Sequence, residues 1–349
     1  MISVDKIKLN AKFIKGPFLI MALFCFSSCF KEHEVKIIHL QGKTMGTTYN
    51  IKYVPSGSFP IDQKLVHQKI ETILKDFNKV ASTYDPSSEI SKINQLEANI
   101  EISVSPIFKL LMKEAIEMNK LSQGVFDPSL SPLINLWGFG AAGKRSTPPV
   151  DQEVRNALKA CGMVNFIFQK SSIRKNNSAS ELDFSAFAKG YGVDLIVLYL
   201  ESVQMDDYFV EIGGEVRTRS KDKQWKIGIE KPDPAQRGHL TKIITLNGAI
   251  ATSGDYRNFY NHAGKKYSHG INFRSGKPVE NNIASVSVFH SRSAMRADAW
   301  ATALMVSESF SEAIDLINKN NLSAFIIYRE AGELKMYESV EWKKEFNND

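Results

Sequence analysis

The stretch from residue 208 to residue 289 contains six short strand patterns with no helical pattern between them. They cover residues 208–212, 225–230, 240–246, 249–253, 266–272 and 284–289. Strands that follow one another directly favour antiparallel pairing, because a parallel sheet needs a crossover segment between successive strands. The sequence therefore favours a mixed, largely antiparallel sheet over a doubly wound parallel one.

Helical spacing of apolar residues appears on both sides of this stretch. This spacing predicts helices over 60–79, 90–96, 106–121, 151–160 and 294–317. Short apolar or alternating segments predict further strands over 35–40, 48–54, 165–169, 324–328 and 335–337. A short strand at 181–184 is expected to pass into a helix that reaches Leu200. A chain of 349 residues exceeds the usual size of one simple core. We therefore expect an α/β fold of the α+β type, with two intimate lobes around a central cleft.

The first 28 residues have the layout of an export signal. Four lysines precede the apolar run 18–26, and two serines follow it. The run is much shorter than the roughly 20 residues that a membrane-spanning helix needs. We therefore expect a cleaved signal and not a permanent membrane span.

Cys29 directly follows Ser27 and Ser28, which resembles a bacterial lipoprotein signal in which the cysteine receives lipid and begins the mature chain. Phe26 departs from the usual leucine at the third position before the cysteine, and plain secretion is the alternative. We expect a signal at 1–28, a tether at 29–40 and a folded domain at 41–349. The protein would be exported and anchored to the membrane, facing the periplasm.

Charge and cysteine content argue against three kinds of function. Setting aside the first 28 residues, with four lysines and one aspartate, leaves 40 basic and 37 acidic residues, a net charge of +3 instead of +6. This excess is too weak to indicate nucleic acid binding. After loss of the signal, Cys161 is the only unmodified thiol, so no intramolecular disulfide can form. Neither a zinc cluster nor a thiol nucleophile is indicated.

Asp298 and Thr302 lie four residues apart in a predicted helix, so both side chains face the same side. Two hard oxygen donors can therefore converge, and Mg²⁺ commonly takes one or two carboxylates and completes its octahedron with water and substrate phosphate. Spacing alone also allows a purely structural explanation, in which both side chains bond to nearby backbone.

Three other segments carry weaker signals. The segment Thr252-Ser253-Gly254-Asp255 ends an apolar strand with hydroxyl groups and a glycine, which suits an anionic ligand or an ordinary polar turn. Glu211-Ile212-Gly213-Gly214-Glu215 could let a ligand ring lie against backbone, but it lacks the spacing of a dinucleotide fingerprint. His269 could accept a proton from a hydroxyl nucleophile, or it could be structural.

Taken together, these motifs resemble the FAD:protein FMN transferase (ApbE) family over about residues 40–340. The matching blocks, in the family's order, are Met45-Gly46-Thr47, Ser82-Thr83-Tyr84, Phe126-Asp127-Pro128 with Trp137-Gly138-Phe139, Leu182-Asp183-Phe184-Ser185-Ala186 with Lys189-Gly190-Tyr191, Glu211 to Glu215, Thr252 to Tyr256, His269, and Ala297-Asp298-Ala299 with Thr302.

The resemblance implies an enzyme that depends on Mg²⁺, cleaves the diphosphate of FAD, releases AMP and attaches FMN through a phosphoester to a threonine or serine of another protein. Asp298 and Thr302 match the family's side-chain metal ligands, and Ala186 matches the position that offers its carbonyl. His269 matches the histidine proposed as general base. The FAD-lining positions are matched by Met45, Tyr84, Val125, Phe126, Asp127, Asp183, Lys189, Thr252, Ser253, Gly254 and Asp255.

One departure concerns the loop after the histidine, where the family often has Ile-Asp-Pro and this chain has Ile271-Asn272-Phe273. The resemblance implies an acceptor motif of the form Asp-x-x-(Ser/Thr)-Gly-Ala-(Ser/Thr), which is absent from this chain, so we expect it to modify exported flavoproteins such as subunits of membrane redox complexes. Two alternatives stay open: an FAD diphosphatase that uses water as acceptor, and a non-catalytic FAD-binding lipoprotein.

Overall fold

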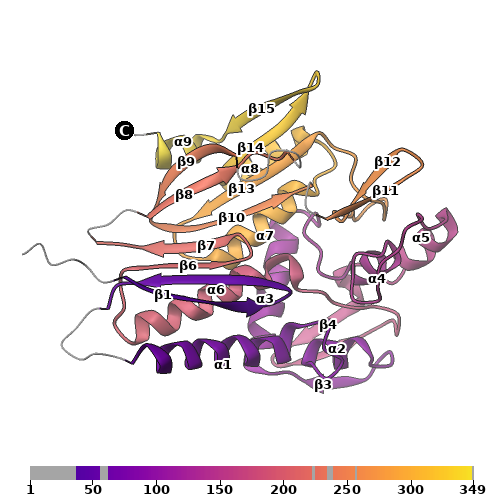
Figure 1. Ribbon diagram of the computed structural model, residues 1–349. Coiled ribbons are helices and arrows are strands. Elements are labelled where there is room, and N and C mark those ends of the chain that lie inside the picture. The colour runs from indigo at the N-terminus through magenta and orange to yellow at the C-terminus, as the bar shows by residue number, and fades with distance from the viewer. Residues whose placement is uncertain (1–36, 56–61, 222–224, 234–238, 256–257, 348–349) are drawn as a thin grey trace, which may run out of the picture. The chain divides into compact units, whose positions relative to one another are not determined.

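An eight-stranded antiparallel sheet is the centre of the structure (Figure 1). The computed structural model describes residues 37–55, 62–221, 225–233, 239–255 and 258–347. In sheet order, the strands are β1 (Ile38–Thr44), β2 (Thr47–Tyr53), β6 (Tyr208–Ile212), β7 (Glu215–Arg219), β10 (Gly248–Gly254), β13 (Ile283–His290), β14 (Ser323–Glu330) and β15 (Glu333–Glu338). The predicted fold class, helices packed on largely antiparallel sheets, is confirmed.

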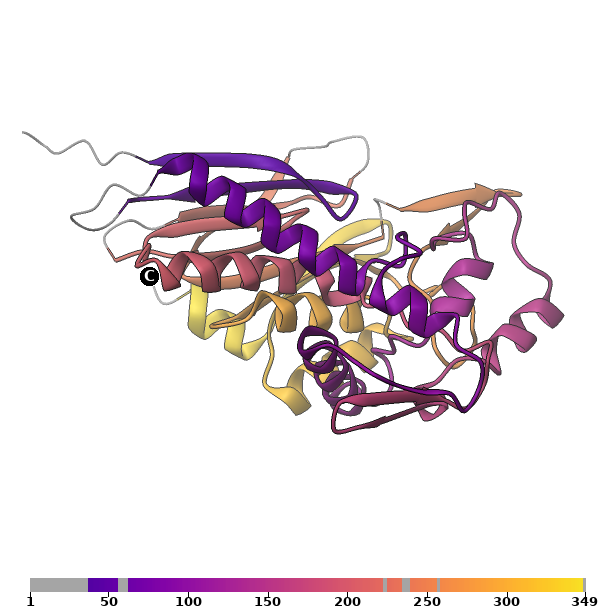
Figure 2. The same ribbon diagram turned by 90° about the horizontal axis from the view of Figure 1, so that it is seen from below.

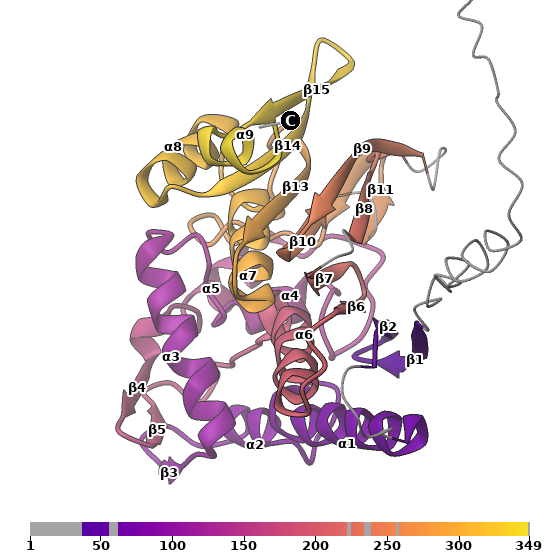
Figure 3. The same cartoon turned by 90° about the vertical axis from the view of Figure 1, so that its left-hand side faces the viewer.

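Helices α6 (Ser185–Ser202) and α7 (Ala294–Met305) cover one face of this sheet (Figure 3). Helix α6 buries residues on nearly every side, because the sheet, α7 and α1 (Gln63–Ala81) pack around it, and α1 also contacts β1 (Figure 2). Val66, Ile70 and Leu74 form the buried stripe of α1, at the spacing that a helix with one apolar face requires. The layer of helices therefore contains an almost completely enclosed helix, α6.

The opposite face of the sheet is covered by a hairpin and the last helix. The covering elements are β8 (Trp225–Glu230), β9 (Leu240–Leu246) and α9 (Val340–Phe346). Ile250 of β10 and Phe325 of β14 point into this side and pack with Trp342 of α9. The neighbouring residues Ala251 and Ala324 belong to the cluster that contains α7, which is the alternation of a sheet buried on both faces.

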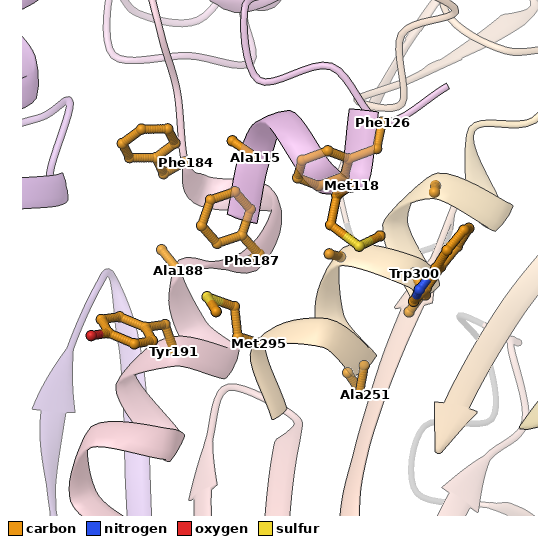
Figure 4. Packing of buried hydrophobic residues seen from close by; sticks show 14 of the residues in the cluster. Ala115, Met118, Phe126, Phe184, Phe187, Ala188, Tyr191, Ala251, Met295 and Trp300 are labelled. Carbon is orange, nitrogen blue, oxygen red and sulfur yellow. The ribbon is translucent and has the colours of Figure 1, made fainter. Parts of the chain in front are cut away.

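A third group of elements lies beside the helices. It contains α2 (Glu89–Asn94), α3 (Pro106–Leu121), α4 (Ser131–Leu136), α5 (Asp151–Leu158), α8 (Phe310–Asn320), the 3-10 turn Met163–Asn165, a small sheet of β3 (Glu101–Ser103), β5 (Ser172–Lys175) and β4 (Phe166–Gln169), and the hairpin of β11 (Phe259–His262) and β12 (Lys265–Ser268). Phe184 and Phe187 at the start of α6 pack near Ala115 and Met118 of α3 (Figure 4).

A smaller apolar cluster, separate from the main core, joins α4, α5 and the hairpin. Its buried members are Leu130, Leu133, Trp137, Val154 and Ile271, and Tyr260 and Tyr267 pack against it. This cluster forms one side of the cavity described below, and the main core forms the other. Residues of the described chain from Ile37 onwards nevertheless belong to one compact unit.

At Gly190, α6 lies directly against the backbone of α7. A Cβ atom at this position would lie 2.3 Å from the carbonyl oxygen of Ala294 and 2.8 Å from Cα of Met295, both backbone atoms of α7. Only glycine fits there without separating the two helices. The backbone contact fixes how near the two helices can lie.

Several predicted elements were wrong in their extent. The predicted helix 294–317 is two helices, α7 and α8, because Ser309 caps a new helix by accepting from the N–H of Glu312 at 3.1 Å. Residues 181–184 form no strand; the backbone N–H and carbonyl of Leu182 instead bond to the side chain of Asn94. The strand predicted over 266–272 ends at Ser268.

Some elements carried too little pattern to be predicted: β3, β5, β7, β11, α4 and α9. The predicted signal at 1–28 and Cys29 lie outside the described residues, and β1 begins at Ile38, inside the range 29–40 predicted as a tether. Among the described helices, none has the length and apolar character needed to span a membrane.

We predict that Gly190→Ala destabilises the protein by about 1–3 kcal/mol, because its methyl group would overlap rigid backbone of α7. Gly192→Ala is the control, since a methyl group there would meet the flexible end of Met45, with Cε at 2.8 Å. Alanine also gains roughly 1 kcal/mol of helix propensity over glycine at both positions. Urea unfolding measures the two values, and equal stability of both variants would contradict the prediction.

Candidate active site

A cavity of about 350 Å³ lies between the main core and the smaller cluster around α4. Its wall is built from the segment 125–134, the start of α6, the turn before β7, the end of β10, the hairpin β11–β12 and one side of α7. Twelve of the predicted site residues line it: Val125, Phe126, Asp127, Ala186, Lys189, Thr252, Ser253, Gly254, Asp255, His269, Asp298 and Thr302. Chain segments far apart in sequence thus meet at one place.

Asp194 of α6 fixes the start of α7. Its carboxylate accepts from the Ser293 hydroxyl at 2.9 Å and from the N–H groups of Ala294 at 2.9 Å and Met295 at 3.1 Å. The first N–H groups of a helix have no partner inside it, and negative charge at this end is favourable. Because α7 is anchored here, Asp298 is held one turn further along, against α6.

Thr302 brings three elements together at the floor of the cavity. Its hydroxyl donates to the carbonyl of Ala186 in the first turn of α6 at 3.2 Å. The hydroxyl of Ser253, near the end of β10, lies 3.5 Å from the same Thr302 oxygen. Two hydroxyl oxygens and one carbonyl oxygen, all uncharged, therefore converge from α7, β10 and α6.

Asp298 adds a carboxylate to the wall of the same cavity, although it is only 2% exposed. Its Oδ2 accepts from the N–H of Gly190 at 3.0 Å, and its Oδ1 lies 3.9 Å from Nζ of Lys189. Burial raises the pKa of Asp298, while the Lys189 ammonium and the Gly190 N–H act in the opposite direction. A cation near Oδ1 would stabilise the ionised form.

Glu215, at the start of β7, is a second buried carboxyl beside Lys189. Its Oε1 lies 3.2 Å from Nζ of Lys189, and its Oε2 has no hydrogen-bond partner among the described residues. Burial, followed by the negative charge of Asp298, raises the pKa of Glu215. Lys189 therefore lies between two carboxyl groups, both on the cavity wall.

Asp298, Thr302 and Ala186 bring the ligand types of a magnesium site, a carboxylate, a hydroxyl and a carbonyl, to one cavity wall. Neighbouring ligands of octahedral Mg²⁺ lie about 3 Å apart, because each bond is 2.0–2.1 Å long. The Thr302 hydroxyl and the Ala186 carbonyl are separated by 3.2 Å. Among the described residues there is no cluster of three histidine, cysteine, aspartate or glutamate side chains that could hold a metal. The donor set suits a cation that takes one carboxylate and keeps positions for water and phosphate.

His269 lies on the rim, directly after β12. Its Nδ1 is 3.1 Å from the carbonyl oxygen of Asn258. A carbonyl can only accept, so Nδ1 carries the proton and Nε2 keeps its lone pair in the neutral ring. The side chain is exposed, but desolvation by the surrounding cavity wall lowers its pKa. The ring is therefore kept neutral, with Nε2 able to accept a proton.

A series of stacked rings holds the hairpin that leads to His269. Tyr267 stacks on Trp137 with centroids 5.7 Å apart and on Tyr260 at 5.3 Å. Tyr260 in turn stacks on Phe139 at 5.5 Å, and the edge of Phe139 contacts the His269 ring at 6.4 Å. The aromatic residues that follow α4 thus set the position of the hairpin and of His269.

Asp255 holds the other side of the hairpin. Its carboxylate accepts from Lys266 of β12 at 3.0 Å and from both terminal nitrogens of Arg329, at 3.0 and 3.1 Å. A paired arginine of this kind is directional as well as strong. In this structure Asp255 links β10, β12 and β14.

Three residues predicted to line the FAD site lie off the cavity wall. Met45 is in the β1–β2 turn with φ of 50° and packs in the core. Tyr84 follows α1 and is 71% exposed. Asp183 is buried, and its carboxylate accepts from the N–H of Ser185 at 2.8 Å. Asp127, by contrast, is on the wall, and its carboxylate also accepts locally, from Ser129.

Glu215, Asn258 and Ile271 also line the cavity but were not among the predicted site residues. The signal for Glu215 was present, since it closes the Gly213-Gly214 segment singled out earlier. Asn258 and Ile271 contribute through their place in the hairpin, which no local pattern reveals. A larger hollow of about 740 Å³ over α1 and α2 contains none of the predicted site residues.

Comparison with known proteins identifies the family. The model of the ApbE family matches residues 45–326. The chain belongs to the ApbE family. The matched range includes every residue that lines the cavity.

Relatives and solved structures agree with this assignment. The FAD:protein FMN transferase of Haemophilus influenzae is 36% identical over 327 residues, covering 91% of this chain and 93% of that protein. The flavin transferase ApbE from Vibrio cholerae has a TM-score of 0.82 at 36% identity, covering 88% of this chain and 99% of that one. The apo flavinyl transferase ApbE from Pseudomonas stutzeri also has a TM-score of 0.82, at 32% identity, covering 90% and 98%.

Asn272, which stands where the ApbE family often has aspartate, keeps the loop after His269 closed. Its side-chain oxygen accepts from the N–H groups of Arg274 and Ser275, both at 2.9 Å. Phe273 takes the place of the usual proline; its ring lies against Gly124, and the Arg274 guanidinium is 4.5 Å from the ring centroid. An amide oxygen thus accepts the two hydrogen bonds that a carboxylate would accept.

We predict that Asn272→Asp keeps the stability of the protein and that Asn272→Ala lowers it by about 1–3 kcal/mol. Alanine removes the acceptor of two backbone N–H groups, and Asn272 itself is only 7% exposed. Urea unfolding of both variants tests this. Wild-type stability of Asn272→Ala would show that water replaces the side chain without cost.

Proposed function

We propose that this protein transfers FMN from FAD to a serine or threonine hydroxyl of an acceptor protein and releases AMP. The observation that carries the proposal is the convergence of Asp298, Thr302 and the Ala186 carbonyl on one cavity whose rim holds His269. The names of the relatives, FAD:protein FMN transferase and flavin transferase ApbE, support it.

In the proposed reaction, the acceptor hydroxyl oxygen attacks the phosphorus on the FMN side of the diphosphate. A new phosphoester bond forms, the bond from that phosphorus to the bridging oxygen breaks, and AMP leaves with this oxygen. Because the neutral His269 ring presents Nε2 as acceptor, it can take the hydroxyl proton during the attack. No oxidant or reductant is needed.

We further propose that Asp298, Thr302 and the Ala186 carbonyl hold Mg²⁺. Such an ion would neutralise part of the negative charge of the diphosphate. Lys189 would contribute a second, fixed positive charge, since its ammonium lies between Glu215 and Asp298 on the cavity wall. The enclosed position of these groups strengthens their interaction with a phosphate anion.

We propose that the mature protein begins at Cys29, carries lipid there and faces the periplasm. The amino-terminal order of lysines, apolar run, serines and cysteine supports this. Its acceptors would then be exported flavoproteins that carry the Asp-x-x-(Ser/Thr)-Gly-Ala-(Ser/Thr) motif, including subunits of membrane redox complexes.

The transfer reaction is tested with FAD, Mg²⁺ and a candidate acceptor, with and without chelator. We expect an acceptor band that keeps flavin fluorescence after denaturing electrophoresis, and loss of this band with chelator. AMP and FMN without a fluorescent band would favour the diphosphatase. Binding of FAD with no AMP release under any condition would favour the non-catalytic FAD-binding protein.

Asp298→Asn is predicted to lower the transfer rate roughly 1000-fold, because loss of the carboxylate charge removes several kcal/mol of electrostatic stabilisation. Asp76→Asn, the same change at an exposed position of α1 where the carboxylate pairs with Lys79, is the control. Initial rates of AMP release measure the effect. A rate within threefold of the control would remove Asp298 from the proposed metal site.

The pH dependence of kcat/KM is predicted to show an acid limb below about pH 6.5. Neutral His269 is the competent form, and its lowered pKa means that the neutral fraction falls only when the pH drops below the ordinary histidine value of 6.5. His269→Gln should lower the rate about 100-fold and remove the limb. His39→Gln, at an exposed position of β1, should keep it. An unchanged limb in His269→Gln would assign the titration to another group.

A further inference from the structure

The hairpin β11–β12 is a two-stranded sheet that ends at the cavity. In Figure 1 it extends away from the eight-stranded sheet, above α4. The pair Asn258 and His269 closes its ladder at the cavity end, and both residues line the cavity. Whatever binds along this hairpin is therefore directed towards His269.

The hydrogen-bond register of the hairpin follows from one contact. The N–H of His269 donates to the carbonyl of Asn258 at 3.2 Å, so these two residues form a hydrogen-bonded pair. Such pairs alternate with non-bonded pairs along an antiparallel ladder. Tyr260 and Tyr267 are therefore bonded to each other, and the pairs between them are not.

The outer edge of β11 consequently has backbone groups that pair with no strand in the described part of the chain. Phe259 and Asn261 belong to non-bonded pairs, so their N–H and carbonyl groups point away from β12. No other strand among the described residues pairs with β11, and both residues are exposed. These are the groups that a further strand would use.

The opposite edge is different. Beyond β12, the carbonyl of Gly270 accepts from the N–H of Val279 at 2.9 Å, and Ile271 bridges to Pro278. The chain itself thus occupies the continuation of the β12 edge near His269. The edge of β11 is the one that stays open up to the cavity in the described part of the chain.

We propose that the acceptor polypeptide binds in extended form along the outer edge of β11, as a third strand of the hairpin sheet. This proposal rests on the proposed function, because it names how the protein substrate of that site is held. The occupant must be a polypeptide whose hydroxyl reaches His269, and an extended backbone offers the N–H and carbonyl groups that match Phe259 and Asn261. The added strand would lie about 4.8 Å from β11.

Recognition through the backbone has two consequences. Neighbouring residues of the acceptor face opposite sides of the sheet, so only alternate side chains contact the enzyme. Affinity then depends on alternate backbone N–H groups of the acceptor and little on the identity of side chains away from the modified residue. The strand β11 has only four residues, and so short an edge limits non-specific pairing with the strands of other proteins.

Asn261→Pro tests the role of the edge in the full-length protein. Proline removes the outward N–H of this residue together with its side chain, and edge strands tolerate it where the N–H faces solvent. Asn261→Ala is the matched control, because it removes the side chain and keeps the N–H. We expect Asn261→Pro to raise KM for the acceptor about tenfold and to leave FAD affinity unchanged, while Asn261→Ala behaves as wild type. Wild-type KM in a folded Asn261→Pro variant would overturn the proposal.

A second measurement uses the substrate and needs no variant of the enzyme. Synthetic peptides that carry Asp-x-x-Thr-Gly-Ala-Thr with flanking residues are N-methylated at one position at a time. Loss of flavin transfer at every second position supports strand addition, and equal transfer for all peptides overturns it. If the wild-type protein binds FAD but transfers FMN to no acceptor, the proposed function fails. That result differs from both outcomes of the peptide series, in which the unmethylated peptide is always modified.

Discussion

The contact between α6 and α7 at Gly190 is the constraint on which the site depends. Because no side chain separates the two backbones, the carboxylate of Asp298 can accept from the Gly190 N–H, and the hydroxyl of Thr302 can reach the Ala186 carbonyl. Asp194 fixes the start of α7 and so sets which residues of that helix meet α6. A change in helix spacing of even an ångström would separate these oxygen donors.

The electrostatics of the cavity follow from this packing. Asp298 and Glu215 are both nearly inaccessible to solvent, a position that favours the neutral carboxyl group, and Lys189 lies between them. A carboxylate placed in this way is a costly structural element but a good ligand for a cation, whose charge offsets the loss of hydration. The same burial that would disfavour an isolated ion thus suits a site that binds a metal and an anionic diphosphate.

Local patterns predicted much of the fold and the core of the site. Helical spacing indicated α1, α3 and α7, and the order of the motifs indicated the family and with it Asp298, Thr302, Ala186 and His269. Patterns failed where tertiary contacts replace local ones. The predicted helix 294–317 ran through the polar residues 307–309, where the Ser309 side chain in fact caps a second helix. Leu182 lacks a strand because the Asn94 side chain takes its backbone hydrogen bonds.

By itself, the sequence determined the class of fold, the residue types that can hold a hard cation, and the presence of a histidine able to accept a proton, because these follow from periodicity and side-chain chemistry. Only the tertiary structure decided that Nδ1 of His269 faces a carbonyl and leaves Nε2 as the proton acceptor, that Glu215 shares Lys189 with Asp298, and that no further strand among the described residues pairs with β11 beside the cavity. Each of these depends on a contact between segments distant in the chain, and residue spacing within one segment carries no information about such contacts.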